Sequence, residues 1–322
     1  MICEKKLGGK NNMKEFIRKN KGVLVLCIIF IILFIGLICL GLNIQKQQVI
    51  EVHKENLQIL ANEKALHINT FLENQKEKQE IISSVGVFKE VVLNPTDTTK
   101  IEAAKNRINE ISPIIHRIAI FTKDGIMFIV ERGPVPIDYS TLPYFVSKDK
   151  NIIFMRYYDP FQKRDYYSVL GPIYDRIEKD KVIGAIAFDV ELEKINSLMK
   201  ETLDNGESDE VYLIDENRLF LSGSEYIGEG NKDGVLIQEV ESDGAKQCLK
   251  DLEKYKKEGF VEEHEEEVIQ YTNYMGNEVF GAHAYVPSIM GCVIAEKSAD
   301  EITKFSLIAL IKNIFKIQKG GK

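Results

Sequence analysis

The chain of 322 residues lacks the short motifs that many enzymes carry at their reaction sites. It contains no Gly-x-Ser-x-Gly nucleophile elbow, no phosphate-binding glycine loop, and no paired cysteines or histidines at zinc-ligand spacing. The Gly-x-Gly piece at residues 228–230 lacks the sequence context of a dinucleotide-binding fingerprint. We therefore expect neither an enzyme nor a bound cofactor.

Cysteine is scarce beyond the N-terminal part of the chain. Three of the five cysteines lie within the first 42 residues, which leaves Cys248 and Cys292. These two could pair in an oxidising compartment, but two cysteines do not make the disulfide framework of a small secreted domain. We do not predict a disulfide.

A long uncharged run occurs near the N-terminus, at residues 23–42. At about 1.5 Å per residue it reaches about 30 Å, enough to cross the hydrocarbon core of a bilayer. Seven lysines and arginines precede it against two glutamates, which predicts a cytoplasmic N-terminus and an extracytoplasmic bulk. A cleaved signal peptide has a shorter apolar region and a small-residue cleavage site, and neither is present. We predict an uncleaved, single-pass anchor in the cell membrane.

The exported part is acidic, because the net charge is −7 although the N-terminal flank is basic. Nucleic acid and anionic membrane surfaces are therefore poor partners. The tail, residues 301–322, differs: five lysines follow its last acid, and its longest uncharged run, residues 305–311, cannot span a membrane. It is either a basic surface helix or the scar of a lost reading frame, and we expect no output domain after it.

A long helix is predicted from residue 43 to about residue 93. Its apolar stripe has spacings of 4, 4, 3 and 4 residues and consists of Leu57, Ala61, Ala65, Ile68 and Leu72. A polar run at residues 76–80 interrupts this stripe. Asp97 is then the expected cap of a second helix at residues 98–111. The long helix either packs on its own domain or also forms a dimer seam.

The periodicity changes to two after Arg117. Residues 118–122 and 126–130 flank Lys123-Asp124-Gly125, which predicts a hairpin with a tight Asp-Gly turn. An irregular, proline-containing stretch at residues 131–156 follows. Strands are next expected at residues 166–170 and 182–190, and a short helix at residues 191–203.

The same order of elements recurs about 100 residues later. A strand, turn and strand are predicted at residues 211–221, followed by strands at 278–286 and 291–296. Gly184-Ala-Ile-Ala-Phe-Asp189 can be aligned with Gly291-Cys-Val-Ile-Ala-Glu296. Two tandem α+β modules of one type are therefore expected.

An anchor, a long helix and two hairpin-bearing modules resemble the double Cache (dCache) extracytoplasmic sensor domains of chemoreceptors and sensor histidine kinases. The pieces that carry the resemblance are residues 64–72, the turn at 123–125, residues 169–175 with 183–190, and residues 210–215. The resemblance covers about residues 53–302. It implies an α+β fold with an N-terminal transmembrane helix, a long membrane-emerging helix and two tandem PAS-like antiparallel-sheet modules.

The parts then follow in order along the chain: a cytoplasmic basic segment (1–22), the transmembrane helix (23–42), the long and second helices (43–111), the membrane-distal module (112–203), the membrane-proximal module (204–300) and the basic tail (301–322). In this family the distal module usually holds a small ligand between its sheet and the irregular segment after the first hairpin. The resemblance therefore implies a ligand site in that module.

Amino-acid-binding relatives share an Arg-Pro-aromatic piece, then a tyrosine, then an aspartate at a strand end. This chain keeps Tyr144 after a proline, Tyr158 and Asp189, but Leu142 stands where the arginine is expected. Arg156 is the nearest substitute, with Arg117 and Arg132 as alternatives. The resemblance therefore implies a ligand site formed by Tyr144, Arg156, Tyr158 and Asp189.

The residue types favour a ligand that carries an ammonium group. A carboxylate such as Asp189, walled by the rings of Tyr144 and Tyr158, suits an ammonium, including by cation–π contact. The missing arginine favours an amine or a differently held small anion over a standard amino acid. In the alternative, both tyrosines are packing residues and Asp189 caps the helix that begins near Glu191.

The acidic run at residues 262–267, with His264 inside it and His283 nearby, is the other candidate site. Consecutive strand or turn residues point to opposite faces, so we predict a solvated loop and no metal site.

We therefore predict a membrane-anchored extracytoplasmic sensor for signal transduction or chemotaxis, without its own output domain. It would bind an amine, amino acid or organic acid. It would form a homodimer through the long helix and act on a receptor or kinase in trans. The alternatives are a structural or partner-binding surface protein, or the sensor fragment of a disrupted chemoreceptor or histidine kinase.

Overall fold

The computed structural model describes residues 21–111, 118–130, 137–138, 140–141, 143–146, 151–159, 164–178, 180–200, 210–222, 235–236, 238–258 and 268–304. Some of the predictions fall outside these ranges. They concern residues 228–230, the acidic run 262–267, Arg117, Arg132, Leu142 and most of the tail. Within them, Lys54–Asp300 forms one compact unit that holds both sheets.

Helix α2 runs from Lys21 to Ser83. Its first part is apolar and exposed, with 73% of Phe30 and 67% of Leu37 accessible. By length and composition it is a helix that could cross a membrane.

The predicted stripe of α2 is confirmed, since its apolar members from Leu57 to Leu72 are buried. The stripe does not stop at the polar run: it continues as Gln75, Gln79 and Ser83, which are also buried. These positions are spaced by four residues and lie on one face of the helix. The sequence interruption is therefore a change in polarity along one buried face.

The prediction of one helix to residue 93 is wrong at Ser84–Val85. The backbone of Val85 is extended, with φ −63° and ψ 124°, and a separate helix α3 (Gly86–Leu93) follows. The hydroxyls of Ser83 and Ser84 donate to the carbonyl oxygens of Glu80 and Ile81. These side-chain bonds satisfy acceptors at the end of α2.

Helix α4 (Thr98–Ile111) follows with the predicted cap. Asp97 Oδ1 accepts hydrogen bonds from the backbone N–H groups of Thr99 at 3.0 Å and Lys100 at 3.3 Å. A cap of this kind satisfies donors that the first turn leaves free.

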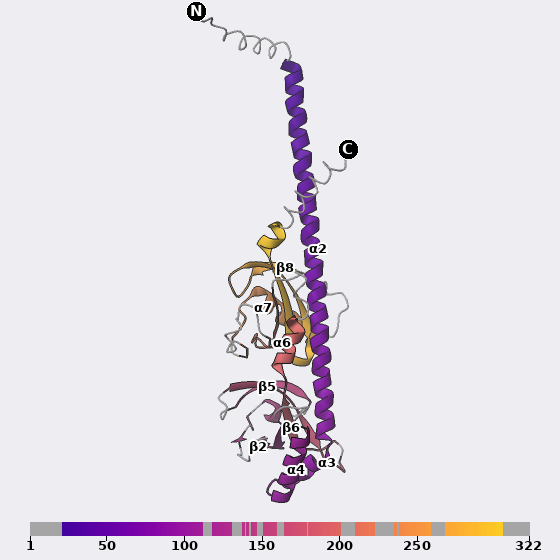
Figure 1. Ribbon diagram of the computed structural model, residues 1–322, viewed down its shortest axis with the longest axis vertical. Coiled ribbons are helices and arrows are strands. Elements are labelled where there is room, and N and C mark those ends of the chain that lie inside the picture. Colours follow the sequence, from indigo (N-terminus) through magenta and orange to yellow (C-terminus); the bar gives the residue numbers. More distant parts are fainter. Residues whose placement is uncertain are drawn as a thin grey trace, which may run out of the picture. The chain divides into compact units, whose positions relative to one another are not determined.

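The distal sheet, in which Figure 1 labels β2, β5 and β6, is antiparallel. Its strand order is β3-β2-β1-β6-β5-β4. Its strands are β1 (Ala119–Thr122), β2 (Ile126–Val130), β3 (Ile137–Asp138), β4 (Ile153–Asp159), β5 (Arg164–Tyr174) and β6 (Val182–Asp189). The β1–β2 hairpin is confirmed, and Gly125 takes the positive φ of 84° that its turn requires. Strand β4 is a correction, because it begins within the stretch that was predicted to be irregular.

The two faces of this sheet pack against different elements. We call front face the side that carries Phe121, Leu170, Ala185 and Ala187, on which helix α5 (Pro143–Val146) packs. The opposite side, the back face, lies against α2 and α3. A Cβ on Gly171 would meet Gln79 of α2, and one on Gly184 would meet Val92 of α3.

The proximal sheet has the order β7-β10-β9-β8, which repeats the part β1-β6-β5-β4 of the distal sheet. Its strands are β7 (Glu210–Ile214), β8 (Ile269–Thr272), β9 (Glu278–Val286) and β10 (Gly291–Ser298). A short helix η2 (Pro287–Ile289) joins β9 to β10, and α6 (Leu192–Lys200) precedes the sheet in the chain. The predicted α+β class with two antiparallel modules is confirmed.

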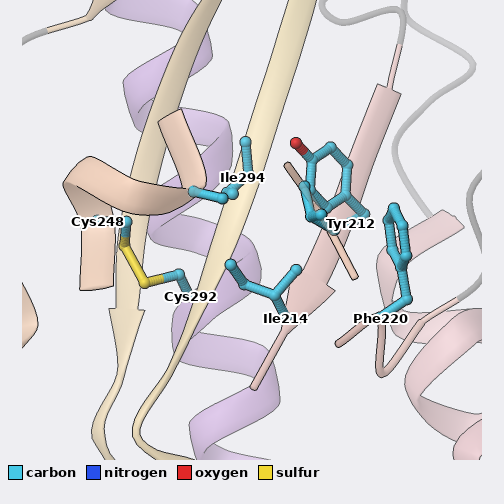
Figure 2. Packing of buried hydrophobic residues seen from close by; sticks show 8 residues of the cluster. Tyr212, Ile214, Phe220, Cys248, Cys292 and Ile294 are labelled. Carbon is cyan, nitrogen blue, oxygen red and sulfur yellow. A yellow bond between two sulfur atoms is a disulfide. The ribbon is translucent and has the colours of Figure 1, made fainter. Parts of the chain in front are cut away.

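Helix α7 (Asp243–Glu258), which the sequence analysis did not predict, covers one face of the proximal sheet. Cys248 of α7 forms a disulfide with Cys292 of β10 (Figure 2). The pairing that the sequence left open is thus present as a disulfide. Helix α7 was not predicted, and only its packing on β10 brings the two Cα atoms to 6.5 Å, within the range of a disulfide.

Candidate functional site

The front face of the distal sheet carries an acidic group where β6 ends. Asp189 shares this face with Ala185 and Ala187, because side chains alternate along a strand. Its register partner on β5 is Ser168, which is buried and donates a hydrogen bond to Asp189 Oδ1 at 2.6 Å. Asp189 itself is half-buried. The site therefore has a fixed carboxylate at one end.

Tyr144 lies on the same face and comes from α5. It is 3% exposed, and it packs against a cluster that contains Ala119, Phe121, Leu170, Ala185 and Ala187. The ring of Phe145 meets that of Tyr144 edge-on at 5.1 Å. Burial raises the pKa of Tyr144, so its phenol stays protonated at physiological pH.

Arg156 and Tyr158 occupy back-face positions, away from Asp189. In the β4–β5 register Arg156 pairs with Tyr167 and Tyr158 with Asp165, whereas Ser168 pairs with Met155. Arg156 is exposed, and its charge acts on Asp215 of the proximal module. The structure thus brings Tyr144 and Asp189 together on the front face. Arg156 and Tyr158 are at positions of the back face.

Three front-face residues escaped the sequence analysis: Ser168, Ile153 and Met155. Ile153 and Met155 are partly buried against the cluster around Tyr144. The alternation of a strand at residues 153–159 would have pointed to them, had that strand been recognised. These side chains give the front face an apolar wall beside the Asp189 carboxylate.

The proximal module has an acid at the equivalent place, which is Glu296 near the end of β10. It lies opposite Gly281 in the register, just as Asp189 lies opposite Ser168. Glu296 is 1% exposed, and its Oε1 accepts hydrogen bonds from the hydroxyls of Tyr212 at 2.7 Å and Tyr271 at 2.6 Å. Its Oε2 accepts one from Asn273 Nδ2 at 3.0 Å. Figure 2 shows Tyr212 among its neighbours.

Tyr271 occupies the space in front of Glu296. A Cβ on Gly281 of β9 would come within 2.3 Å of the Tyr271 hydroxyl, and one on Gly244 of α7 would come within 2.4 Å of it. The ring therefore needs both glycines. Burial raises the pKa of Glu296, while the hydrogen bonds from the two tyrosines and Asn273 oppose this shift. The proximal acid is thus saturated by donors from its own module.

Among the described residues, no group of three His, Cys, Asp or Glu side chains could hold a metal ion. His283, considered above as a metal ligand, is instead buried in the proximal module with Asp251 at 3.9 Å.

The family model of the Cache domain, in its double form, matches residues 42–304. The chain belongs to the Cache domain family. No curated protein matches it. The resemblance stated from the sequence is thereby confirmed, and the two sheets are the two modules of a double Cache domain.

Solved structures of similar fold are sensor domains. The sensor domain of the V. cholerae histidine kinase DctB has a TM-score of 0.54 at 11% identity and covers 79% of this chain and 98% of its own. The ligand-binding domain of Mlp24 with asparagine has a TM-score of 0.53 at 13% identity and covers 81% and 98%. The sensory domain of the Campylobacter jejuni chemoreceptor Tlp3 with isoleucine bound has 0.48 at 16% and covers 80% and 98%. At these identities the likeness concerns the fold.

Proposed function

We propose that this Cache domain protein is a membrane-anchored extracytoplasmic sensor that binds a small ammonium-bearing ligand on the front face of its distal module. Asp189 would accept the hydrogen bonds of the ammonium, and Tyr144 with Met155 would form the wall beside it. Arg156 and Tyr158 occupy back-face positions, so we leave them out of this ligand site.

The comparison of the two strand-end acids carries the proposal. Glu296 is met by three donors from its own module, and Tyr271 fills the space in front of it. Asp189 occupies the equivalent position in the distal sheet. Its partner on the neighbouring strand is Ser168, whereas the partner of Glu296 is Gly281. An ammonium group on the front face would give the half-buried Asp189 carboxylate, which Ser168 holds in place, a charge-assisted partner. Charge-assisted bonds of this kind are stronger than neutral ones.

Mlp24, which shares the fold, was solved with asparagine, an amino acid that carries an ammonium group. Asparagine is therefore a suitable first probe. Simple amines are the second class to test. Amino-acid-binding relatives have an arginine directly before the Pro-aromatic pair, and this chain has Leu142 there.

Two observations support an extracytoplasmic place for the modules. The Cys248–Cys292 disulfide persists in oxidising compartments and is rare in the cytosol. The apolar start of α2, preceded by a basic segment, fits an anchor with its N-terminus in the cytoplasm.

We also propose that two copies associate through α2. Val52, Ile59 and Leu66 follow one another at intervals of seven residues, and they are 55%, 57% and 65% exposed. Residues seven apart lie on one side of a helix, so these side chains form an exposed apolar stripe that a second copy could cover. A charge introduced at Leu66, with Leu66→Glu, should shift the full-length protein in nanodiscs or detergent toward the monomer in a mass measurement by light scattering.

The ligand proposal is tested by thermal shift on the full-length protein in detergent with asparagine, isoleucine and small alkylamines. At least one compound should raise the Tm of the wild type and leave Asp189→Asn unchanged. Asp180→Asn, an exposed carboxyl of the same module, is the matched control and should respond like the wild type. A shift that survives in Asp189→Asn would contradict the assigned site. No shift with any of them would favour a structural or partner-binding surface protein.

A further inference from the structure

Strand β4 faces two parts of the molecule. Ile153 and Met155 point to the front face and pack against the cluster that contains Tyr144. Phe154 and Arg156 point to the back face, because neighbouring side chains of a strand alternate. β4 lies at the edge of the described sheet, after β5. A shift of this strand at the front face must therefore also move its back-face side chains.

Phe154 is the start of a chain of contacts to the proximal module. Its ring stacks on Tyr167, with centroids 6.1 Å apart, and the Lys76 ammonium of α2 lies 5.9 Å from its centroid. Lys76 donates to Glu73 Oε1 at 2.7 Å, and Ser288 Oγ of η2 donates to the same oxygen at 2.5 Å. These two bonds hold the pKa of Glu73 below its usual value. Glu73 thus ties β4 to the turn between β9 and β10.

Arg156 reaches the proximal module at a second point. β4 contacts η2 directly, and the Arg156 charge opposes the burial that raises the pKa of Asp215. Asp215 follows β7 and organises its turn, since its Oδ1 accepts the backbone N–H groups of Asn217 at 2.9 Å and Leu219 at 2.8 Å. Strand β4 therefore contacts η2, and the charge of its Arg156 acts on the carboxylate that holds a proximal turn in shape.

We infer that strand β4 transmits the state of the distal front face to the proximal module, with Phe154 and Arg156 as its positioning residues. The contacts that it uses are partly exposed and individually weak, so they can rearrange without unfolding either sheet. The inference rests on the proposed function only in taking the front face as the ligand face. Its test needs no ligand, so the two can fail separately.

The test uses amide hydrogen exchange on the full-length protein in detergent, with Asn217 and Leu219 as reporters in the proximal module. Met155→Ala loosens the front face of β4 and should speed exchange at both amides by about fivefold. In an Arg156→Gln background the same substitution should change their exchange by less than about twofold. The amide of Ile294, in the central strand β10, reports on global unfolding and should stay unchanged.

Phe121→Leu is the matched control, because it removes packing from the same cluster on β1, which has no part in these contacts. It should leave Asn217 and Leu219 unchanged. Should Met155→Ala fail to fold, Ile153→Val replaces it. The inference is overturned if β4 variants have no effect on the reporters, if Phe121→Leu has an equal effect, or if Arg156→Gln leaves the effect of Met155→Ala intact.

Discussion

The distal and proximal sheets place an acid at the same position and surround it differently. Asp189 ends β6, and Glu296 lies near the end of β10. Strand β6 lies between β1 and β5, and β10 lies between β7 and β9, so the two strands hold the same place in their sheets. Glu296 is buried under its own tyrosines and under α7, which a disulfide fixes to β10. Asp189 is half-buried beside Ser168, on a face that α5 packs against.

The difference lies between an acid that is held inside its own module and an acid that, in the proposed function, receives the ligand. A buried acid whose donors are internal makes a polar network that fixes one arrangement of the core. In the proposed function, the half-buried Asp189 instead takes the ammonium of the ligand as a partner. The proximal module is therefore expected to be the more rigid of the two, and its stability should depend on bonds that have no counterpart in the distal module.

The largest expected effect comes from removing the disulfide. Cys248→Ala with Cys292→Ala opens a crosslink between residues 44 apart and should cost about 4 kcal/mol of unfolding free energy. Urea unfolding of the full-length protein, followed by exchange at β10 and β6 amides, would show the loss in the proximal module. Cys39→Ala, in the exposed apolar part of α2, is the control and should have no effect. Equal losses in both modules would contradict the expectation that the disulfide stabilises the proximal module in particular.

The next effect compares the two acids directly. Glu296→Ala leaves three buried donors without their acceptor and should cost about 3 kcal/mol. Asp189→Ala should cost less, about 1 kcal/mol, because it removes the acceptor of one buried donor, the Ser168 hydroxyl, instead of three. Denaturation midpoints of the two variants test the order. A greater loss for Asp189→Ala would make it a structural residue.

The alignment of Asp189 with Glu296 shows how much could be predicted from sequence. Strand alternation and repeat spacing placed both acids at equivalent positions, and the order of elements predicted two antiparallel modules. Tyr158 was grouped with Asp189 because it is the tyrosine that the resemblance implies, and Arg156 because it lies two residues before Tyr158. Without the strand at residues 153–159 and its register, nothing in the sequence indicates on which face of a sheet they lie.

Long-range pairing also explains the missed disulfide and the role of Tyr271. Cys248 and Cys292 meet because α7 packs on β10, and Tyr271 reaches Glu296 because Gly244 and Gly281 leave room for its ring. These are contacts between elements far apart in the chain. Local periodicity predicts such elements but not how they pack.

A smaller effect, opposite in sign, is expected at Gln79 on the back face of the distal sheet. Gln79 is 1% exposed, and neither of its amide atoms has a hydrogen-bond partner among the described residues. Gln79→Leu removes this unsatisfied group and should stabilise the distal module by about 1 kcal/mol. Asn74→Leu, at an exposed site on the same helix, controls for helix propensity. Stabilisation by Asn74→Leu alone would assign the effect to the helix and not to burial.

The smallest expected effect is a pH dependence confined to the proximal module. Burial lowers the pKa of His283, and Asp251 at 3.9 Å opposes this shift only in part. The unfolded chain therefore takes up a proton more readily than the folded one. The contribution of neutral His283 is present above the ordinary pKa of 6.5 and is lost as the pH falls through the lowered folded pKa.

His283→Gln removes this titration, so its urea midpoint should fall less than that of the wild type between pH 7.5 and 5.5. His67, on the surface of α2, is the matched site: His67→Gln should keep the wild-type dependence. Glu296 faces the same side of the sheet, and its raised pKa acts in the opposite direction, since its contribution declines as the pH rises above 4.5. A steeper loss on acidification in His283→Gln than in the wild type would contradict the sign of the His283 shift.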